Sequence, residues 1–473
     1  MPCQLPADCL NEIFEYLERK KRSLYSCLLV NRFWCGISVR ILWRDVWDTK
    51  SAESRLIVNS LILDTLIICL PNNSKIHLLE KGILDSTQIS KTPLFDYPSF
   101  CKVLSIIDIG QTIVNVFKSQ NYLAKEIMKM FMTKTSLKKL YYYNGTHTIN
   151  LSFLRYPGAK DYLSNLSKLS CSSDIKSNFF YMLSQICCKI QSLAINLREK
   201  ISDDLKNLIS SQHNLKELSL SPIKLGSVAY QTTIMSPLAK HSSSLIKLNV
   251  LCNNMYGLID LPSFITPFTN LQELILSFHI NGAVEFNKLQ NITFQQLQIL
   301  KFPRNCPNDD VLIKFLENNG ENLKEFHINS MISNLMILTI AKYCLNLKSL
   351  YVLFNCDGIE ALKTLLNNCQ QLESIETRCR FNLVKGKEFL EALAKYSPKN
   401  FYKLKLINNS NSKLVPEDLE EFFTKWKDRV PQRMISFINK GLFRLKDEKE
   451  IAKVIQKYRE LGVMKNFVCV FKK

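Results

Sequence analysis

A short apolar pattern recurs through most of this chain of 473 residues. It reads Leu-x-x-Leu-x-Leu, with other apolar residues and one Thr also filling the three positions, and from residue 137 eleven copies follow at steps of 24 to 30 residues. The alternating spacing predicts a short strand with one buried face. The copies are Leu137/Leu140/Tyr142, Leu166/Leu169/Cys171, Ile190/Leu193/Ile195, Leu215/Leu218/Leu220, Leu245/Leu248/Val250, Leu271/Leu274/Leu276, Leu297/Leu300/Phe302, Leu323/Phe326/Ile328, Leu347/Leu350/Val352, Leu372/Ile375/Thr377 and Phe401/Leu404/Leu406.

The segments between the copies have helical apolar spacing. Together, strand and helix resemble leucine-rich repeats, whose units run about 20–29 residues and must stack to bury a core. Three thiols each precede the next copy by three residues, which resembles the cysteine-containing subclass; we expect Cys187, Cys344 and Cys369 to be buried and reduced. A weaker twelfth copy, Cys101/Leu104/Ile106, lies upstream. The predicted helices are 204–209, 311–317, 335–343, 359–366, 388–396 and 418–427.

The first 47 residues predict three short helices instead. Pro6 suits the first position of a helix, where its missing N–H is not needed. Residues 24–30 and 32–42 predict the second and third helix. The first helix carries one apolar stripe at helical spacing: Leu10, Ile13, Phe14 and Leu17.

These helices resemble the F-box. The motifs are Leu-Pro at 5–6, Ile-Phe-x-x-Leu at 13–17, Leu-x-x-Cys at 24–27 and Val-Asn-Arg-x-Trp at 30–34. The resemblance implies docking to a Skp-type linker protein and, through it, to a cullin. One departure is the basic turn at 18–22, where the family often has an acidic one. The contact positions carried over are Leu5, Pro6, Leu10, Ile13, Leu17, Leu24, Leu28, Val30 and Trp34.

The size of this segment also favours a partner. Three small helices cannot all turn this many apolar side chains inward, and units below roughly 40–60 residues usually need a staple or a partner. The alternative is that the helices only cap the rest of the chain.

The predicted fold class is therefore α/β: an N-terminal three-helix F-box followed by a leucine-rich-repeat solenoid, a horseshoe of about 11–12 strand–helix repeats. We divide the chain into an F-box over 1–47, a helical linker over 48–98, the repeats over 99–430 and a C-terminal cap over 431–473. Within the cap, residues 447–461 predict an amphipathic helix and residues 467–471 a final strand.

Composition excludes several function classes. The longest apolar stretch, residues 56–70, contains Asn59 and Asp64 and is too short to cross a bilayer, and no signal peptide opens the chain. We therefore expect a cytoplasmic or nuclear protein. The six histidines are scattered and no C-x-x-C occurs, so no metal or cofactor is expected. No catalytic motif is present, which predicts a protein that is not an enzyme.

The target-binding surface is expected on the strands, where side chains between the skeleton positions point away from the core. Over all twelve copies these positions hold seven basic and four acidic residues, although the whole chain has a net charge of +20. The charge is thus not focused on this face, which argues against a nucleic-acid partner. The residues expected to bind the target are Lys301, His327, Tyr351, Glu376, Arg378 and Lys405.

These observations predict a substrate-recognition adaptor of an SCF-type ubiquitin ligase, with an unknown target protein. Two alternatives stay open. One is an F-box and leucine-rich-repeat scaffold that works outside a ligase. The other is a basic solenoid that binds RNA or acidic partners, since the net charge is +20.

Overall fold

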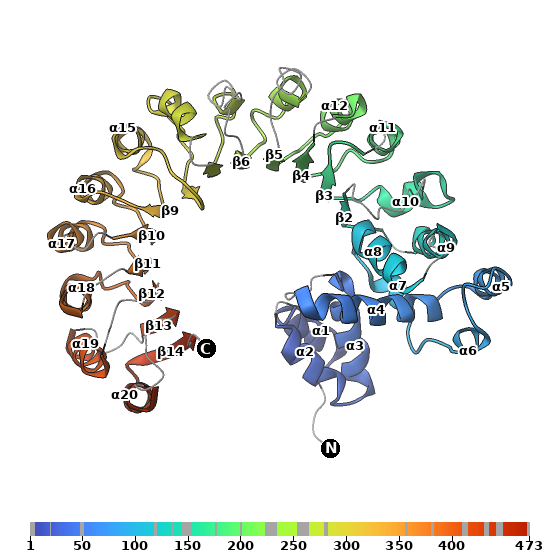
Figure 1. Cartoon of the computed structure of the whole chain (residues 1–473), viewed down its shortest axis with the longest axis horizontal. Helices are drawn as coiled ribbons and strands as arrows, with labels where there is room; N and C mark the ends of the chain where they lie inside the picture. Colours follow the sequence, from blue (N-terminus) through green and yellow to red (C-terminus); the bar gives the residue numbers. More distant parts are fainter. Residues whose placement is uncertain are drawn as a thin grey trace. The chain divides into compact units, whose positions relative to one another are not determined.

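The structure is a computed structural model that divides the chain into two compact units. Unit 1 is Met1–Leu220 with Thr232–Lys240, and unit 2 is Ser221–Gln231 with His241–Lys473. Figure 1 shows helices alone in the first part of unit 1, and helices and strands following one another in the rest of unit 1 and in unit 2. The residues described are 5–18, 20–47, 52–117, 121–134, 136–143, 153–175, 177–198, 201–222, 234–252, 264–278, 282–354, 358–379, 383–408, 415–429, 435–440 and 448–470.

Unit 1 begins with three short helices, as expected. They are α1 (Ala7–Glu15), α2 (Lys21–Leu28) and α3 (Arg32–Leu42), and the short 3₁₀ helix η1 (Trp43–Asp45) follows. Asn31 caps α3, because its side-chain oxygen accepts a hydrogen bond from the backbone N–H of Trp34 at 2.9 Å. The three-helix prediction is confirmed.

Four more helices lead into the repeats: α4 (Ala52–Ile68), α5 (Asn72–Glu80), α6 (Ser86–Ile89) and α7 (Tyr97–Phe100). A buried polar contact ties α4 to α8 (Ile106–Val116), where Asn59 Nδ2 donates to Asp108 Oδ1 at 3.3 Å. Within the described residues no single helix is long and apolar enough to cross a membrane; part of α4 with α5 meets that test only as a pair bent by 109°.

The repeats of unit 1 form parallel strands in chain order. They are β1 (Val103–Ser105), β2 (Lys139–Tyr142), β3 (Lys168–Ser172), β4 (Ser192–Leu197) and β5 (Glu217–Pro222). From β1 to β4, neighbouring strands align their skeleton positions, as in Leu140 beside Leu169 and Leu169 beside Leu193. The helices between them are α8, α9 (Asn121–Met132), η2 (Phe153–Arg155), α10 (Ala159–Leu163), α11 (Ser177–Ile186) and α12 (Asp203–Ser210), and α13 (Ser236–Ala239) follows β5.

Unit 2 continues the same plan, with strands that again follow chain order. Its strands are β6 (Lys247–Cys252), β7 (Glu273–Phe278), β8 (Ile299–Phe302), β9 (Glu325–Met331), β10 (Ser349–Leu353), β11 (Ser374–Cys379), β12 (Lys403–Asn408), β13 (Ile435–Lys440) and β14 (Met464–Val470). Its helices are η4 (Gly282–Leu289), α15 (Asp309–Asn319), α16 (Asn334–Tyr343), α17 (Ile359–Asn368), α18 (Leu383–Tyr396), α19 (Pro416–Arg429) and α20 (Glu448–Glu460). The α/β solenoid expected from the repeats is confirmed.

The sheet extends two strands past the last predicted repeat. Strand β13 pairs in parallel with β12 and with β14, so this part of the expected cap carries further strands. The sequence pattern missed β13 because its third skeleton position is Asn439, which lies beside Leu406 of β12. The final strand expected at 467–471 is found as β14, and Phe471 lies outside the described residues.

Asparagines tie successive repeats together. The residue just before the first skeleton leucine donates its side-chain N–H to a backbone carbonyl one repeat earlier. In unit 2 these bonds join Asn270 to Ser243, Asn322 to Gln295 and Asn346 to Glu321, at 2.7, 3.0 and 2.9 Å. They satisfy carbonyls in the turns that enter the strands, where no ladder partner is available.

The three phased cysteines are buried between helix and strand. Cys187 Sγ lies 3.3 Å from the Leu166 carbonyl oxygen, and Cys369 Sγ lies 3.5 Å from that of Cys344, one repeat earlier in each case. Burial raises the pKa of Cys187, raises that of Cys369 to about 12, and raises that of Cys344 further. Since the thiolate is the reactive form, the raised pKa values and the burial favour the unreactive thiol in the fold.

We therefore expect Cys187, Cys344 and Cys369 to resist iodoacetamide in the native protein and to react once it is unfolded in guanidinium. Cys9, which is exposed, is the internal control and should react at once. Mass spectrometry of peptides after timed labelling measures each site. Rapid native labelling of all three buried thiols would contradict the repeat phase described above.

Candidate functional site

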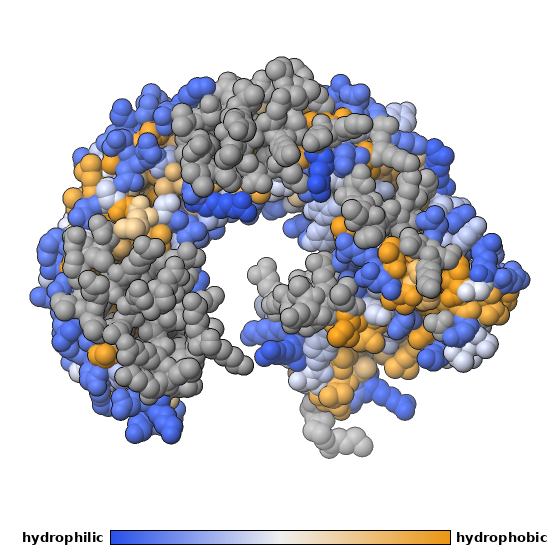
Figure 2. All heavy atoms as spheres, in the orientation of Figure 1, coloured by the Kyte–Doolittle hydropathy of each residue, from blue (hydrophilic) through white to orange (hydrophobic). Residues whose placement is uncertain are grey.

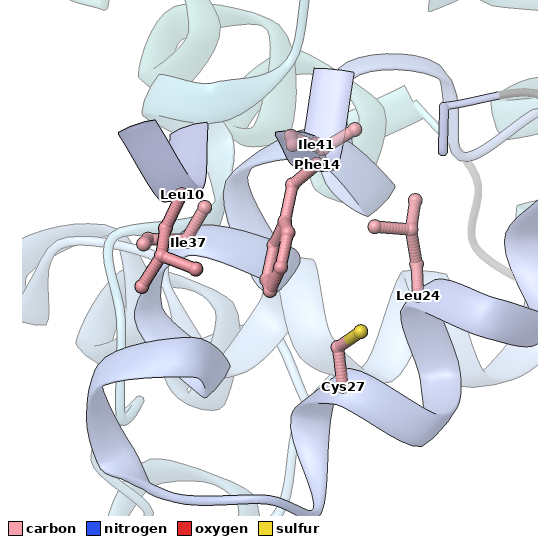
Figure 3. Close-up of a cluster of buried hydrophobic side chains, with 6 residues drawn as sticks. All are labelled: Leu10, Phe14, Leu24, Cys27, Ile37 and Ile41. Carbon is pink, nitrogen blue, oxygen red and sulfur yellow. The ribbon is translucent and has the colours of Figure 1, made fainter. Parts of the chain in front are cut away.

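The three N-terminal helices pack around one small core (Figure 3). At one side of it the Phe14 and Trp34 rings meet edge-on, with centroids 5.1 Å apart. The residues that fill the core are Leu10, Phe14, Leu24, Cys27, Ile37 and Ile41, with Leu17, Trp34 and Leu42 packed partly against them. This core buries one apolar stripe of each helix, and other apolar side chains of these helices lie outside it.

The apolar side chains left over are exposed, and Figure 2 shows apolar residues reaching the surface over these helices. Leu29 is the extreme case, with 88% of its surface exposed, directly after the end of α2. Contact of a large apolar side chain with water is unfavourable, and a group of such exposed side chains marks a surface that a partner can cover. We call the following set the helical docking surface: Leu5, Ile13, Tyr16, Tyr25, Leu29, Val30 and Phe33.

The residues predicted to contact the linker protein separate by burial. Leu5, Pro6, Ile13 and Val30 are exposed, and Leu17, Leu28 and Trp34 are partly buried. Leu10 and Leu24 are only 3% and 0% exposed.

Leu10 and Leu24 thus lie in the core of the three helices, and their contact with a linker protein stays a prediction. The physical reason for this burial is that a short helix turns its most regular stripe inward.

Sequence reasoning left four exposed residues out of the predicted contact set: Tyr16, Tyr25, Leu29 and Phe33. A signal for one of them was present. Leu28, Leu29 and Val30 are consecutive, and one helix face can bury only one of three successive residues.

Charged side chains near the end of α1 and the start of α2 contact the short helix η1, which follows α3. Arg44 in η1 forms ion pairs with Glu15 at the end of α1 and, at 3.8 Å, with Glu18. The bond to Arg44 lowers the pKa of Glu15. In the basic turn, Lys21 Nζ donates to the Asp45 carbonyl oxygen at 3.1 Å, and Arg19 lies outside the described residues. Part of the basic turn thus holds the fold together.

The residues predicted to bind a target form one register row in unit 2, which we call the strand row. Lys301, His327, Tyr351, Glu376 and Lys405 occupy matching positions of β8 to β12. Ion pairs occur toward both ends: Lys301 with Glu325 at 3.0 Å, and Lys405 with Glu376. The row is therefore charged at both ends but locally neutralised.

An aromatic stack occupies the middle of the strand row. The His327 and Tyr351 rings lie nearly parallel, with centroids 3.9 Å apart and planes at 14°. Tyr351 is only 7% exposed, and its hydroxyl donates to Asn329 Oδ1 at 2.9 Å. Burial lowers the pKa of His327, so the neutral ring is favoured.

Tyr351 is thus largely buried in the strand row, and its contact with a target stays a prediction. Its hydroxyl and ring are held inside the row, where they position His327, which keeps part of its surface open. The backbone of Arg378 lies in β11, but its side chain is outside the described residues.

A comparison with models of protein families finds a match for the three N-terminal helices. Residues 2–48 match the family model described as F-box-like. Among solved structures, the chain is similar to the leucine-rich repeat-containing protein LegL7 from Legionella pneumophila, at 14% identity and a TM-score of 0.34, over 64% of this chain and 94% of that one. No curated protein sequence matches the chain.

The burial pattern generates a paired test of the three-helix core. Leu24→Ala removes a fully buried side chain and should destabilise these helices by about 2–5 kcal/mol. Leu29→Ala removes an exposed leucine and should change their stability by less than about 0.5 kcal/mol. Hydrogen exchange of the α1–α3 amides in the full chain measures both. Equal protection in the two variants would contradict the packing described.

Proposed function

We propose that this chain, which joins an F-box-like domain to a leucine-rich-repeat solenoid, is the substrate-recognition adaptor of an SCF-type ubiquitin ligase. An F-box domain generally implies a Skp-type linker as its partner, and adaptors of this architecture are typically not catalytic. In the proposal the linker protein brings a cullin, the repeats hold a target protein, and the complex works in the cytoplasm or nucleus.

One observation carries the proposal: the helical docking surface. Seven large apolar side chains are exposed on and beside three short helices whose own core is complete without them. A stable interface buries on the order of 1,000 Å² or more, and its centre is apolar and aromatic. Tyr16, Tyr25 and Phe33 supply the aromatic part, and Leu29 and Val30 the aliphatic part. This composition suits a permanent protein partner.

The strand row supports a protein target over a polyanion. Its lysines are already paired with glutamates, so little free positive charge is left for phosphates. Neutral His327 on the Tyr351 ring presents a flat polar group between two ion pairs. Such a mixture of an aromatic face and both signs of charge is typical of protein recognition.

The chain's own contribution would be proximity. An adaptor that holds the target beside a ubiquitin-conjugating enzyme converts a bimolecular encounter into an effectively intramolecular step. No group of this chain needs to react. The division into F-box, linker, repeats and cap at 47, 98 and 430 is part of the same proposal.

The docking surface is tested by a paired change of Leu29→Asp and Val30→Asp. Carboxylates buried in an apolar interface cost several kcal/mol, so recovery of the linker protein by affinity purification of the full chain should be lost. Leu335→Asp is the matched control, because Leu335 is also an exposed leucine, at the start of α16 in unit 2. The control should recover the linker as the unchanged protein does.

Undiminished recovery by the Leu29 and Val30 variant would refute the docking proposal. The same purification separates a ligase subunit from a scaffold that acts outside a ligase. Recovery of both linker and cullin is expected here. Linker without cullin would favour the scaffold.

The strand row is tested by a combined Lys301→Glu and Lys405→Glu change. Each substitution turns an ion pair into two like charges, so capture of bound target proteins should fall by about tenfold, about 1.4 kcal/mol. Lys363→Glu is the control, because Lys363 is likewise paired with a glutamate, Glu360, but on α17. Quantitative mass spectrometry of proteins recovered with each variant measures the change. If capture of targets falls in the Lys363→Glu control and not in the double variant, recognition lies on the helices instead.

A further inference from the structure

Five Ser-Pro or Thr-Pro dipeptides occur in this chain, and their hydroxyl residues are Thr92, Ser221, Ser236, Thr266 and Ser397. Such a dipeptide is the minimal sequence that a proline-directed protein kinase modifies. The kinase must also reach the hydroxyl, and it binds the acceptor segment in an extended conformation. The surroundings of each dipeptide in the fold therefore decide which of the five can be modified.

Four of the five dipeptides lie in packed parts of the fold. Ser221 belongs to strand β5, and Ser236 opens helix α13, where the proline that follows it is buried. Ser397 is 0% exposed. Thr266 and the proline after it are exposed, but Phe268 at the next position is buried, so the chain turns into the core there.

Thr92 lies in a different setting, in the segment 90–96 that links α6 to α7 (Figure 1). Residues 91–94 are all exposed and lie outside helices and strands. Leu94, two positions after the threonine, is 79% exposed. Pro93 fixes its own φ and biases Thr92 toward an extended backbone. The segment thus presents a hydroxyl, a proline ring and a leucine to solvent together.

This exposed segment is anchored on both sides. Before it, Lys75 Nζ of α5 donates to the Lys91 carbonyl oxygen at 3.2 Å, although the Lys75 side chain belongs to a residue that is only 3% exposed. Lysine is rarely buried unless its amine has a partner. After the segment, Asp96 forms an ion pair with Lys134 at 2.9 Å. The two anchors fix where the exposed residues 92–94 begin and end.

We propose that Thr92 is a modification site, which a proline-directed protein kinase phosphorylates. In that step Thr92 Oγ forms a bond to the γ-phosphorus of ATP, the bond from that phosphorus to the β–γ bridging oxygen breaks, and ADP leaves. The hydroxyl proton passes to the catalytic carboxylate of the kinase. The site shares no residue with the helical docking surface or the strand row, and its modification does not depend on the function proposed above.

The surroundings of Thr92 also suit the product. A phosphothreonine carries a charge of about −1.5 to −2 at neutral pH. Lys91, directly before Thr92, is exposed and can pair with that charge. Because residues 91–94 face solvent, the phosphate stays hydrated and no charge has to be buried. The modified chain should therefore keep its fold.

The test uses the full chain in its native state, magnesium ATP and an active mitogen-activated protein kinase, a class that requires proline after the acceptor. Mass spectrometry of peptides measures phosphate at all five hydroxyls over time. A synthetic peptide for each dipeptide gives the rate of that sequence when nothing covers it. Relative to its own peptide, Thr92 should be modified at least about tenfold faster than Ser236 or Ser397, because packed sites react only after local opening.

Pro93→Ala is the diagnostic variant, because it keeps the hydroxyl but removes the proline that this kinase class requires. Phosphate at Thr92 should be lost in it, whereas Thr92→Ser should keep phosphate at this position. Thr266→Ala is the matched control, since it removes the hydroxyl of the other exposed Thr-Pro dipeptide and should leave Thr92 unaffected. The melting temperatures of all variants, and of the phosphorylated chain, should match that of the unchanged chain.

Four results would overturn the proposal. The first is a native chain that stays unmodified at Thr92 while the Thr92 peptide is modified, which would mean that the fold hides the hydroxyl. The second is a Thr92 peptide that the kinase leaves unmodified. The third is phosphate that persists at Thr92 in the Pro93→Ala variant, which would exclude a proline-directed reaction. The fourth is modification of all five sites at the rates of their peptides, which would mean that packing does not select Thr92.

Discussion

The structure depends on one constraint: a single repeat cannot bury its own apolar face. Each strand turns its skeleton residues inward, and only the neighbouring strands and the covering helix exclude water from them. Parallel pairing in register then follows, with Leu274 beside Leu300 and Leu350 beside Ile375. The asparagine side chains support this stacking because they donate hydrogen bonds to backbone carbonyls of the preceding repeat. The buried cysteines support it because they fill the space between helix and strand. The stack also aligns the residues between the skeleton positions into rows.

Those rows explain how a regular solenoid obtains distinct surfaces. The skeleton positions are nearly invariant in polarity, but the positions between them are free to differ from repeat to repeat. In unit 2 they hold paired charges and the His327–Tyr351 stack. In unit 1 they hold lysines without a described carboxylate partner. The surface of the N-terminal helices arises in another way. Their core is too small to bury every apolar residue, so the remaining apolar residues stay exposed.

The candidate sites were predictable to different degrees. The motif at 30–34 and the apolar stripe of α1 pointed to the correct three helices, and residues 2–48 match an F-box-like model. Which of their apolar residues face outward was not predictable, since Leu10 and Leu24 belong to the stripes that pack together. In the strand row the period placed Tyr351 on the correct face. Its ring is nevertheless covered, because His327 of the preceding strand lies flat on it.

The sequence by itself determined the architecture. A period of 24–30 residues with three apolar positions leaves stacked parallel strands as the way to bury them, and Pro, Asn and the helical stripes mark where helices begin. The tertiary structure alone decided exposure and pairing. Strand β13 forms despite Asn439, because it is covered by β12 and β14. Lys301 forms an ion pair with Glu325 and Lys168 lies beside Ser192, because a side chain's neighbour comes from the next repeat, some 25 residues away in sequence and one strand away in space.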